Sequence, residues 1–278
     1  MEFVKKNNIA VLITVHNRKA KTLKCLQDLY DQELLDGYSF DVWLTDDGCV
    51  DGTPEEVAEQ FPKVHIIHGD GTLYWNRGMY TAWESAKSND YDYYFWLNDD
   101  TNLKKNALRD MLTAAEQRKG QSIIVGITRS IKQETTTYGG YINGRLLNPN
   151  GTFQQCETFN GNCVLIPKYA YKIVGNLDWT YRHAIGDLDY GYCAGRAGIK
   201  SYVTPTYIGY CDKNPKLPAW ARKEIPFVKR VKNLYSPLGY ANPFTFFHFD
   251  KKNFGVLTAI KHFISIHIRL LFPQLWKE

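Results

Sequence analysis

The stretch YDYYFWLNDDT, residues 91–101, combines a short apolar run with two adjacent aspartates. Tyr91–Leu97 is typical of a strand that is buried on both faces of a parallel sheet. Asp99 and Asp100 lie just beyond it, and two like charges side by side repel each other unless a cation neutralises them. Mg²⁺ and Mn²⁺ are typically held by one or two carboxylates together with phosphate oxygens. The pair therefore predicts a divalent cation beside a phosphorylated ligand.

The residues around this stretch alternate between strand-like and helix-like patterns. The other short apolar runs are Ile9–Val15, Asp41–Thr45, Val64–Ile67 and Ser122–Ile127. The helical patterns are the spacing of Leu23, Leu26, Tyr30 and Leu34, the segment that Pro54 opens, and the segments Met79–Ala86 and Leu103–Ala115. This order predicts an α/β fold with a mainly parallel sheet flanked by helices, in which ligands bind beyond the carboxyl ends of the strands.

The chain divides into a main domain, residues 1–212, and an extension, residues 213–278. Within the main domain, residues 128–212 contain turn signals between short strands and predict a sub-region that closes over the sheet. Asn214–Asn242 is rich in proline and basic residues and predicts an extended connector to a C-terminal helix.

The C-terminal helix is expected within residues 254–273, which are apolar but interrupted by four basic residues or histidines. Such a segment is too polar to span a membrane. An amphipathic helix with Ile260, Phe263, Ile264, Ile266 and Leu270 on one side fits better. Two interpretations remain open: the helix lies on a membrane surface, or it packs on the domain.

Composition excludes several classes of protein. The chain has 278 residues, 44% of them hydrophobic and 23% charged, which is ordinary for a globular protein. Its net charge of +5 suits a diphosphate or an anionic membrane but is too weak to indicate nucleic acid. The six cysteines form no C-x-x-C pair, which argues against a structural zinc site and a disulfide-stapled domain. No apolar leader is visible at the N-terminus, so a reduced, cytoplasmic setting is the expectation.

Three further strand ends or helix starts carry polar residues. Thr14–Arg18 follows the first strand and contains neither a dinucleotide-binding glycine pattern nor a P-loop. Asp46-Asp47-Gly48 follows the second strand, and Asp187 stands at the start of a late helix. Each aspartate has a structural alternative, because aspartate is common in turns and at helix N-termini. The functional alternative is ligand binding for Asp46 and Asp47 and general-base chemistry for Asp187.

Six stretches, in this order, resemble the family-2 inverting glycosyltransferases of GT-A fold, particularly the bacterial rhamnosyltransferase-like branch that builds surface polysaccharides. The resemblance covers about residues 9–212. The stretches are ITVHNR, LTDDGCVDGT, GDGTLYWNRGM, FWLNDDT, FNGNCVLIPK and IGDLDYGYCAGRAG. It implies that residues 1–127 bind a nucleotide sugar and that residues 128–212 form the acceptor side.

The resemblance assigns roles to the residues at the strand ends. In that family the loop that here runs from Thr14 through Val15 and His16 to Arg18 borders the nucleotide base. Asp47, beside Asp46, contacts the base, Asp99 lies near the ribose and the metal, and Asp100 is the metal ligand. Asp187 is the general base that deprotonates the acceptor.

Two departures from the family pattern affect this assignment. Arg77 is expected near the phosphates, but the order Trp75-Asn76-Arg77-Gly78 differs from the commoner Arg-Asn-x-Gly. Trp75 could stack on the donor sugar or simply belong to the core. Many relatives also have a histidine after the late helix, where Tyr207–Asp212 contains none. Either Cys211 or Asp212 substitutes, or Asp100 and the diphosphate alone hold the metal.

The implied reaction is a single displacement with inversion at the anomeric carbon, assisted by Mn²⁺ or Mg²⁺. A UDP-sugar is the first expectation for the donor and dTDP-rhamnose the second. A glycan or lipid-linked glycan at the inner face of the cell membrane is the expected acceptor, and nucleic acid is not an expected partner. Two alternatives remain: a nucleotidyltransferase, although the loop after the first strand lacks the expected glycines and lysine, and a non-catalytic carbohydrate-binding relative.

Overall fold

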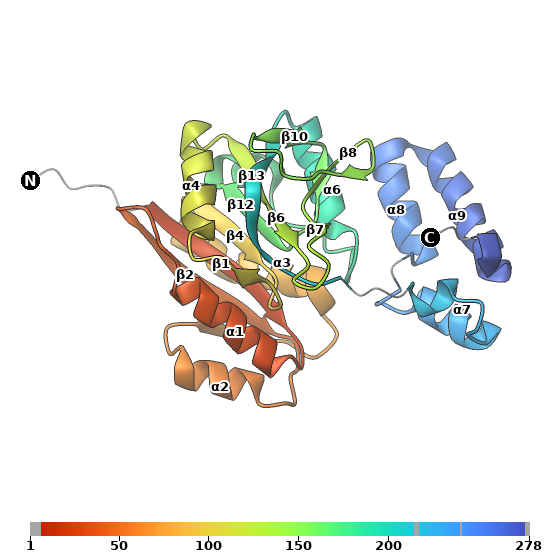
Figure 1. The fold of residues 1–278 in the computed structure, drawn as a ribbon. Helices are drawn as coiled ribbons and strands as arrows, with labels where there is room; N and C mark the ends of the chain where they lie inside the picture. The colour runs from red at the N-terminus through yellow and green to blue at the C-terminus, as the bar shows by residue number, and fades with distance from the viewer. Residues whose placement is uncertain (1–6, 214–216, 240, 276–278) are drawn as a thin grey trace, which may run out of the picture.

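A computed structural model describes residues 7–213, 217–239 and 241–275 (Figure 1). Its centre is a mixed sheet with the strand order β10-β13-β6-β12-β4-β1-β2-β3, to which β5 and β7 add at β13 and β6. The strands of this path are β1 (Asn7–Val15), β2 (Tyr38–Asp46), β3 (His65–His68), β4 (Tyr93–Leu97), β6 (Ser122–Arg129), β10 (Gln154–Cys156), β12 (Cys163–Pro167) and β13 (Lys200–Tyr210). The short additions are β5 (Asn102–Leu103) and β7 (Thr136–Tyr138).

Most strands of the central sheet run parallel. β1 pairs in parallel with β2 and β4, β2 with β3, and β6 with β13. The antiparallel β12 lies between β4 and β6. A small second sheet contains β8 (Gly140–Ile142), β9 (Arg145–Leu146) and β11 (Thr158–Phe159).

Helices cover both faces of the sheet, because consecutive residues of the buried strands point to opposite sides. Ile9, Val11 and Ile13 of β1 pack towards α1 (Lys19–Tyr30), α2 (Thr53–Gln60) and α4 (Ala107–Gln117). Ala10 and Leu12 pack on the other side, with α3 (Tyr74–Ala86), α5 (Lys168–Val174) and α6 (Gly186–Arg196). The predicted α/β sheet flanked by helices is confirmed.

The C-terminal extension contains three further helices, α7 (Phe227–Tyr235), α8 (Pro243–Phe254) and α9 (Val256–Leu271). Short 3₁₀ turns are η1 (Lys87–Asn89), η2 (Ala219–Ala221) and η3 (Pro273–Leu275). Figure 1 shows α7–α9, in blue, gathered beside α6 and away from α1 and α2. No helix within the described residues is long and apolar enough to cross a membrane.

The structure corrects three sequence-based expectations. The connector 214–242 is not extended, since it contains η2 and α7; residues 214–216 and 240 lie outside the described part. The helix expected at Leu103 begins at Ala107, because Asn102–Leu103 pairs with Tyr210 and Gly209 of β13. The five apolar residues expected on one side of the C-terminal helix do not all share one side of α9. Ile266 and Leu270 are buried, whereas Ile260 and Ile264 are exposed.

Candidate active site

A cavity of about 640 Å³ lies beyond the carboxyl ends of β1, β2 and β4. Nine of the eleven predicted site residues line it: Thr14, Val15, His16, Arg18, Asp47, Trp75, Asp99, Asp100 and Asp187. The parallel strands bring the first loop and the aspartates after β2 and β4 to one edge, and the first turn of α6 contributes Asp187 to the same lining. Asp46 and Arg77 are not part of its lining.

Arg18 bridges the Asp99-Asp100 pair. Its Nη1 atom lies 3.0 Å from Asp99 Oδ1 and 2.9 Å from Asp100 Oδ2, and Lys21 Nζ lies 3.7 Å from the same Asp100 oxygen. Asp99 is 4% exposed, and burial raises its pKa to about 6 although the positive charge of Arg18 opposes the shift. Asp100 is more accessible, with 19% of its side chain exposed. Asp100 is therefore the carboxylate that an incoming cation reaches more easily.

The surroundings of Asp100 bear on the missing histidine. Cys211 Sγ lies 3.5 Å from Asp100 Oδ1, and the amide of Asn162 lies 3.5 Å from the same sulfur. Asp212 turns away, because its Oδ1 accepts hydrogen bonds from Ser130 Oγ and from the Ile131 backbone N–H. No group of three histidine, cysteine or acidic side chains with metal-binding geometry occurs among the described residues. Adjacent carboxylate oxygens suit Mg²⁺ or Mn²⁺, which commonly bind one or two carboxylates and take their other ligands from phosphate and water.

Asp47 organises the loop that borders the cavity. Its carboxylate accepts backbone N–H bonds from Gly71, Leu73 and Tyr74 at 2.9, 3.1 and 2.7 Å. Its carbonyl oxygen lies 2.6 Å from His16 Nδ1, so the first loop is attached to the same residue. Asp47 therefore lines the cavity with its carboxylate already occupied by the loop that leads into α3.

Asp46 points away from the cavity. Its carboxylate accepts from the backbone N–H of Cys49 at 2.9 Å and lies 3.0 Å from His68 Nδ1. Burial opposes ionisation, but the hydrogen bonds from Cys49 and His68 outweigh it and lower the pKa of Asp46. These contacts place Asp46 in the turn after β2.

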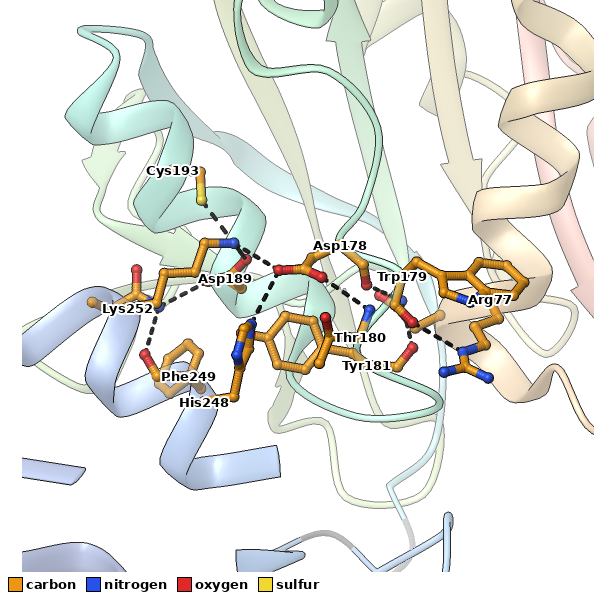
Figure 2. A network of polar contacts seen from close by, with 12 residues as sticks. Arg77, Asp178, Trp179, Thr180, Tyr181, Asp189, Cys193, His248, Phe249 and Lys252 are labelled. Atoms are coloured by element: carbon orange, nitrogen blue, oxygen red, sulfur yellow. Dashed lines mark hydrogen bonds and ion pairs between the residues drawn. The ribbon is translucent and has the colours of Figure 1, made fainter. Parts of the chain in front are cut away.

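The first turn of α3 directs Trp75 and Arg77 to different sides. Trp75 Nε1 donates to Asn98 Oδ1 at 2.7 Å, and its ring packs so closely on Gly161 that a Cβ there would lie 2.4 Å from Trp75 Cζ2. Arg77 Nε donates instead to the carbonyl of Trp179 at 3.0 Å, and its guanidinium lies 4.7 Å from the centre of the Trp179 ring (Figure 2). Arg77 thus contacts the segment before α6 rather than the cavity.

Asp187 lies in the first turn of α6, as the sequence predicts. Its Oδ2 accepts from the Gly161 N–H at 2.8 Å and its Oδ1 from the Leu188 N–H at 2.9 Å. Burial raises the pKa of Asp187 despite these hydrogen bonds. Ile185, two residues earlier, adopts φ 79°, a conformation that β-branched residues rarely adopt. The backbone is therefore held in an unusual shape directly before the carboxylate.

His183 is a cavity residue that the sequence interpretation overlooked. It lines the cavity four residues before Asp187, and its buried Nδ1 has no hydrogen-bond partner among the described residues. Burial, with a smaller contribution from the charge of Arg18, lowers its pKa. His183 precedes α6, so no helical spacing in the sequence relates it to Asp187. Other lining residues outside the prediction are Gly71, Tyr74, Asn98, Tyr138, Asn160, Gly161, Asn162, Ala184, Ile185 and Leu238.

Comparison with known proteins gives a family match over more than half of the chain. The model of a family described as glycosyl transferase family 2 matches residues 10–174. The match contains the first loop, the DDG segment and the Asp99-Asp100 pair, and it ends before Asp187. No protein of curated function matches the sequence significantly.

Solved structures resemble the fold at low sequence identity. S. aureus TarS has a TM-score of 0.57 at 14% identity, and the match covers 94% of this chain and 43% of TarS. The mannosyltransferase PcManGT from Pyrobaculum calidifontis, in complex with GDP-Man and Mn²⁺, has a TM-score of 0.55 at 14% identity, covering 94% and 75%. Residues 1–349 of S. aureus TarS in complex with UDP give 0.54 at 14% identity, covering 90% and 70%. The match thus covers less than half of the first TarS chain, and at this identity the likeness is one of fold.

Proposed function

The chain belongs to glycosyl transferase family 2, and on that premise we propose that it moves a hexosyl or deoxyhexosyl unit from a nucleoside-diphosphate sugar to a hydroxyl group of a glycan or lipid-linked glycan. The observation that carries the proposal is the shared cavity of Asp99, Asp100 and Asp187, whose residues lie almost ninety positions apart in the sequence. A binding-only protein needs neither a carboxylate pair at the phosphate end nor a partly buried carboxylate at the acceptor end.

In the proposed reaction Asp187 removes the proton from the acceptor hydroxyl. The hydroxyl oxygen attacks the anomeric carbon from the side opposite the diphosphate, the bond to the diphosphate oxygen breaks, and the configuration inverts. Burial of Asp187 supports this role, because a raised pKa makes a carboxylate a stronger base. The N–H groups of Gly161 and Leu188 hold its two oxygens in place for the acceptor.

Asp100, with Asp99, would hold Mn²⁺ or Mg²⁺, which supplies Lewis-acid stabilisation of the departing diphosphate. Arg18 contributes positive charge at the same place, since it already contacts both carboxylates. The bound GDP-Man and Mn²⁺ of PcManGT and the UDP of TarS support a donor of this class. We favour a UDP-hexose over dTDP-rhamnose, and a place in surface polysaccharide synthesis in the rhamnosyltransferase-like branch.

A thermal-shift series followed by a transfer assay tests this function. UDP, GDP, dTDP and CMP are each added with and without Mn²⁺, and the matching nucleotide raises the melting temperature by mass action. Nucleotide sugars carrying that nucleotide are then tested for release of the free nucleotide. Release of inorganic pyrophosphate from a nucleoside triphosphate supplied with a sugar 1-phosphate would instead indicate a nucleotidyltransferase, and binding without any turnover would indicate a carbohydrate-binding relative. Activity that survives EDTA unchanged would remove the metal from the proposal.

The extension supports a membrane-associated acceptor. Residues 213–278 contain twelve Lys and Arg against three Asp and Glu, whereas residues 1–212 contain 22 against 26. The outer face of α9 is apolar and exposed, at Leu257, Ile260, Ile264, Ile268 and Leu271. An apolar stripe on a strongly basic segment complements an anionic bilayer. We place the enzyme at the inner face of the cell membrane, where it would meet a lipid-linked glycan.

The connector between α7 and α8 links this surface to the cavity. Leu238 is 57% exposed and also lines the cavity beside the acceptor-side residues. The extension therefore contributes a residue to the cavity lining.

A further inference from the structure

The segment 178–189 carries the acceptor side of the cavity and is held at both ends by one lysine. Four of the cavity-lining residues, His183, Ala184, Ile185 and Asp187, come from this segment. Lys252 Nζ of α8 donates to Asp178 Oδ2 at 3.0 Å and to Asp189 Oδ2 at 2.6 Å. Figure 2 shows the ammonium group between the two carboxylates, with the segment looping away from them.

Neighbouring residues of α8 reinforce this contact. Asn253 Nδ2 donates to Asp189 Oδ1 at 2.8 Å, and His248 Nε2 lies 3.2 Å from Asp178 Oδ2. The ring of His248 also meets Tyr181 edge-on, with 5.4 Å between the centroids. Both oxygens of Asp189 are therefore bound by α8, although Asp189 belongs to the same helical turn as Asp187.

The electrostatics favour a persistent contact. Asp189 is 3% exposed at its side chain and Lys252 31%. Burial opposes the charge of each partner, yet hydrogen bonds from Thr180 and Lys252 hold the pKa of Asp178 well below its usual range, and those to Asp189 and Asp178 raise the pKa of Lys252. The buried carboxylate of Asp189 would be strongly destabilised without the ammonium group of Lys252. Separation of the segment from α8 therefore costs free energy.

The opposite side of the segment is held by α3. Asn76 Nδ2 donates to the carbonyls of Asp178 and Tyr181, both at 2.9 Å, and Arg77 donates to that of Trp179. The segment therefore forms hydrogen bonds on one side with α3, which follows the donor-binding loops, and on the other side with α8, which belongs to the extension. A carboxylate attached to a segment held on both sides keeps a fixed position in the cavity.

We propose that Lys252 is a positioning residue for glycosyl transfer: it holds segment 178–189 so that Asp187 and His183 face the acceptor. The proposal rests on the proposed function, in which Asp187 is the base. In this proposal the C-terminal extension positions the acceptor side of the cavity, in addition to contacting the membrane. Donor binding depends on Arg18, Asp99 and Asp100, which lie outside the segment.

Lys252→Met and Lys251→Met form a matched pair for the test. Lys251 is the exposed neighbour on the same helix and forms no ion pair within the described residues. In Lys252→Met we expect kcat to fall about 10- to 100-fold, as a small misplacement of a catalytic group does, with nucleotide affinity unchanged within about twofold. Lys251→Met should behave as wild type, and Lys252→Arg should recover part of kcat.

A double variant separates positioning from stability. Asp189→Asn/Lys252→Met removes the buried charge together with its partner, so its melting temperature should return towards that of wild type while kcat stays low. Recovery of both quantities would show a purely structural ion pair and overturn the proposal. In Lys252→Met the acidic limb of the pH–kcat profile should also move to lower pH, because water reaching Asp187 lowers its pKa.

Hydrogen–deuterium exchange tests directly whether Lys252 holds the segment in place. Residues 178–189 should exchange faster in Lys252→Met than in wild type or Lys251→Met, while the loop from Thr14 to Arg18 should not change. Unchanged exchange in the segment, or faster exchange with undiminished kcat, would contradict the proposal. If the wild-type protein transfers no sugar, the proposed function fails, and the exchange data alone decide whether Lys252 fixes the segment.

Discussion

Asp187 combines two properties of a general base, a raised pKa and a fixed orientation. Both oxygens accept backbone N–H bonds, so the side chain cannot rotate freely, and burial disfavours its charged form. Asp99 shares the burial but has a cation beside it. The two carboxylates therefore suit different tasks within one cavity, proton transfer and charge binding.

Asp187→Asn tests the base at the residue scale. Asparagine keeps the shape and one acceptor oxygen but cannot take the proton, so kcat should fall by about 10²- to 10⁴-fold. Nucleotide binding, measured by calorimetry, should stay within twofold of wild type. An Asp187→Asn protein with near-full transfer activity would remove Asp187 from the proposed mechanism.

Asp99→Asn tests how burial affects stability with pH. A raised folded-state pKa means that the folded protein binds the proton more tightly, so wild type is stabilised below the unfolded pKa near 4 and loses that contribution as pH rises through about 6. Asp99→Asn should lack this pH dependence, which is on the order of 1–3 kcal/mol. Urea unfolding at pH 4.5 to 8 measures it, with the exposed Asp36→Asn as control. Parallel pH curves for Asp99→Asn and wild type would contradict the burial argument.

At the scale of elements, the start of α6 is fixed by close packing against α3. A Cβ at Gly186 would lie 1.7 Å from Asn76 Oδ1, so only glycine fits between the two helices. Later in the same helix Gly195 has open space around it. The two glycines therefore share a helix and differ in what surrounds them.

Gly186→Ala and Gly195→Ala should change stability in opposite directions. In Gly186→Ala overpacking should destabilise the protein by about 1–3 kcal/mol and lower kcat, because α6 carries Asp187. In Gly195→Ala the better helix propensity of alanine should stabilise it by up to about 1 kcal/mol without affecting transfer. Chemical denaturation of both variants measures the difference. Equal effects would show that α6 is not tightly packed at its start.

On the scale of the whole molecule, the positive and negative charges are unevenly distributed along the chain. The domain that holds the carboxylates is slightly acidic, whereas the extension is strongly basic and exposes the apolar face of α9. Such a division orients a protein towards an anionic surface, because attraction acts on one end only.

Leu257→Asp/Ile264→Asp should weaken binding to vesicles that contain phosphatidylglycerol. The two substitutions place charge on the exposed apolar face, while wild type should bind these vesicles, bind phosphatidylcholine vesicles less, and lose affinity as salt rises. Co-sedimentation measures this, with the remote, exposed Gln121→Asp as the control for added charge. Deleting residues 254–278 should likewise reduce vesicle binding and leave nucleotide binding intact. Unchanged vesicle binding in the double variant, or a dimer that the variant disrupts, would contradict the membrane contact.

The sequence alone predicted the α/β sheet, because apolar runs and their order determine strands locally. It also predicted that the strand-end carboxylates lie at one edge, because the carboxyl ends of parallel strands meet there. The Asp99-Asp100 pair that indicated a cation does lie in the cavity, beside Arg18. These features depend on short stretches of chain, which a sequence pattern describes well.

Only the tertiary structure decided where individual side chains point. Arg77 contacts Trp179 instead of the cavity, Cys211 rather than Asp212 lies beside Asp100, and Asp189 binds Lys252 sixty-three residues away. Each of these contacts joins elements that are distant in sequence, and the direction of a side chain depends on the partner it meets. No local periodicity encodes that partner, because it is set by the packing of whole helices against the sheet.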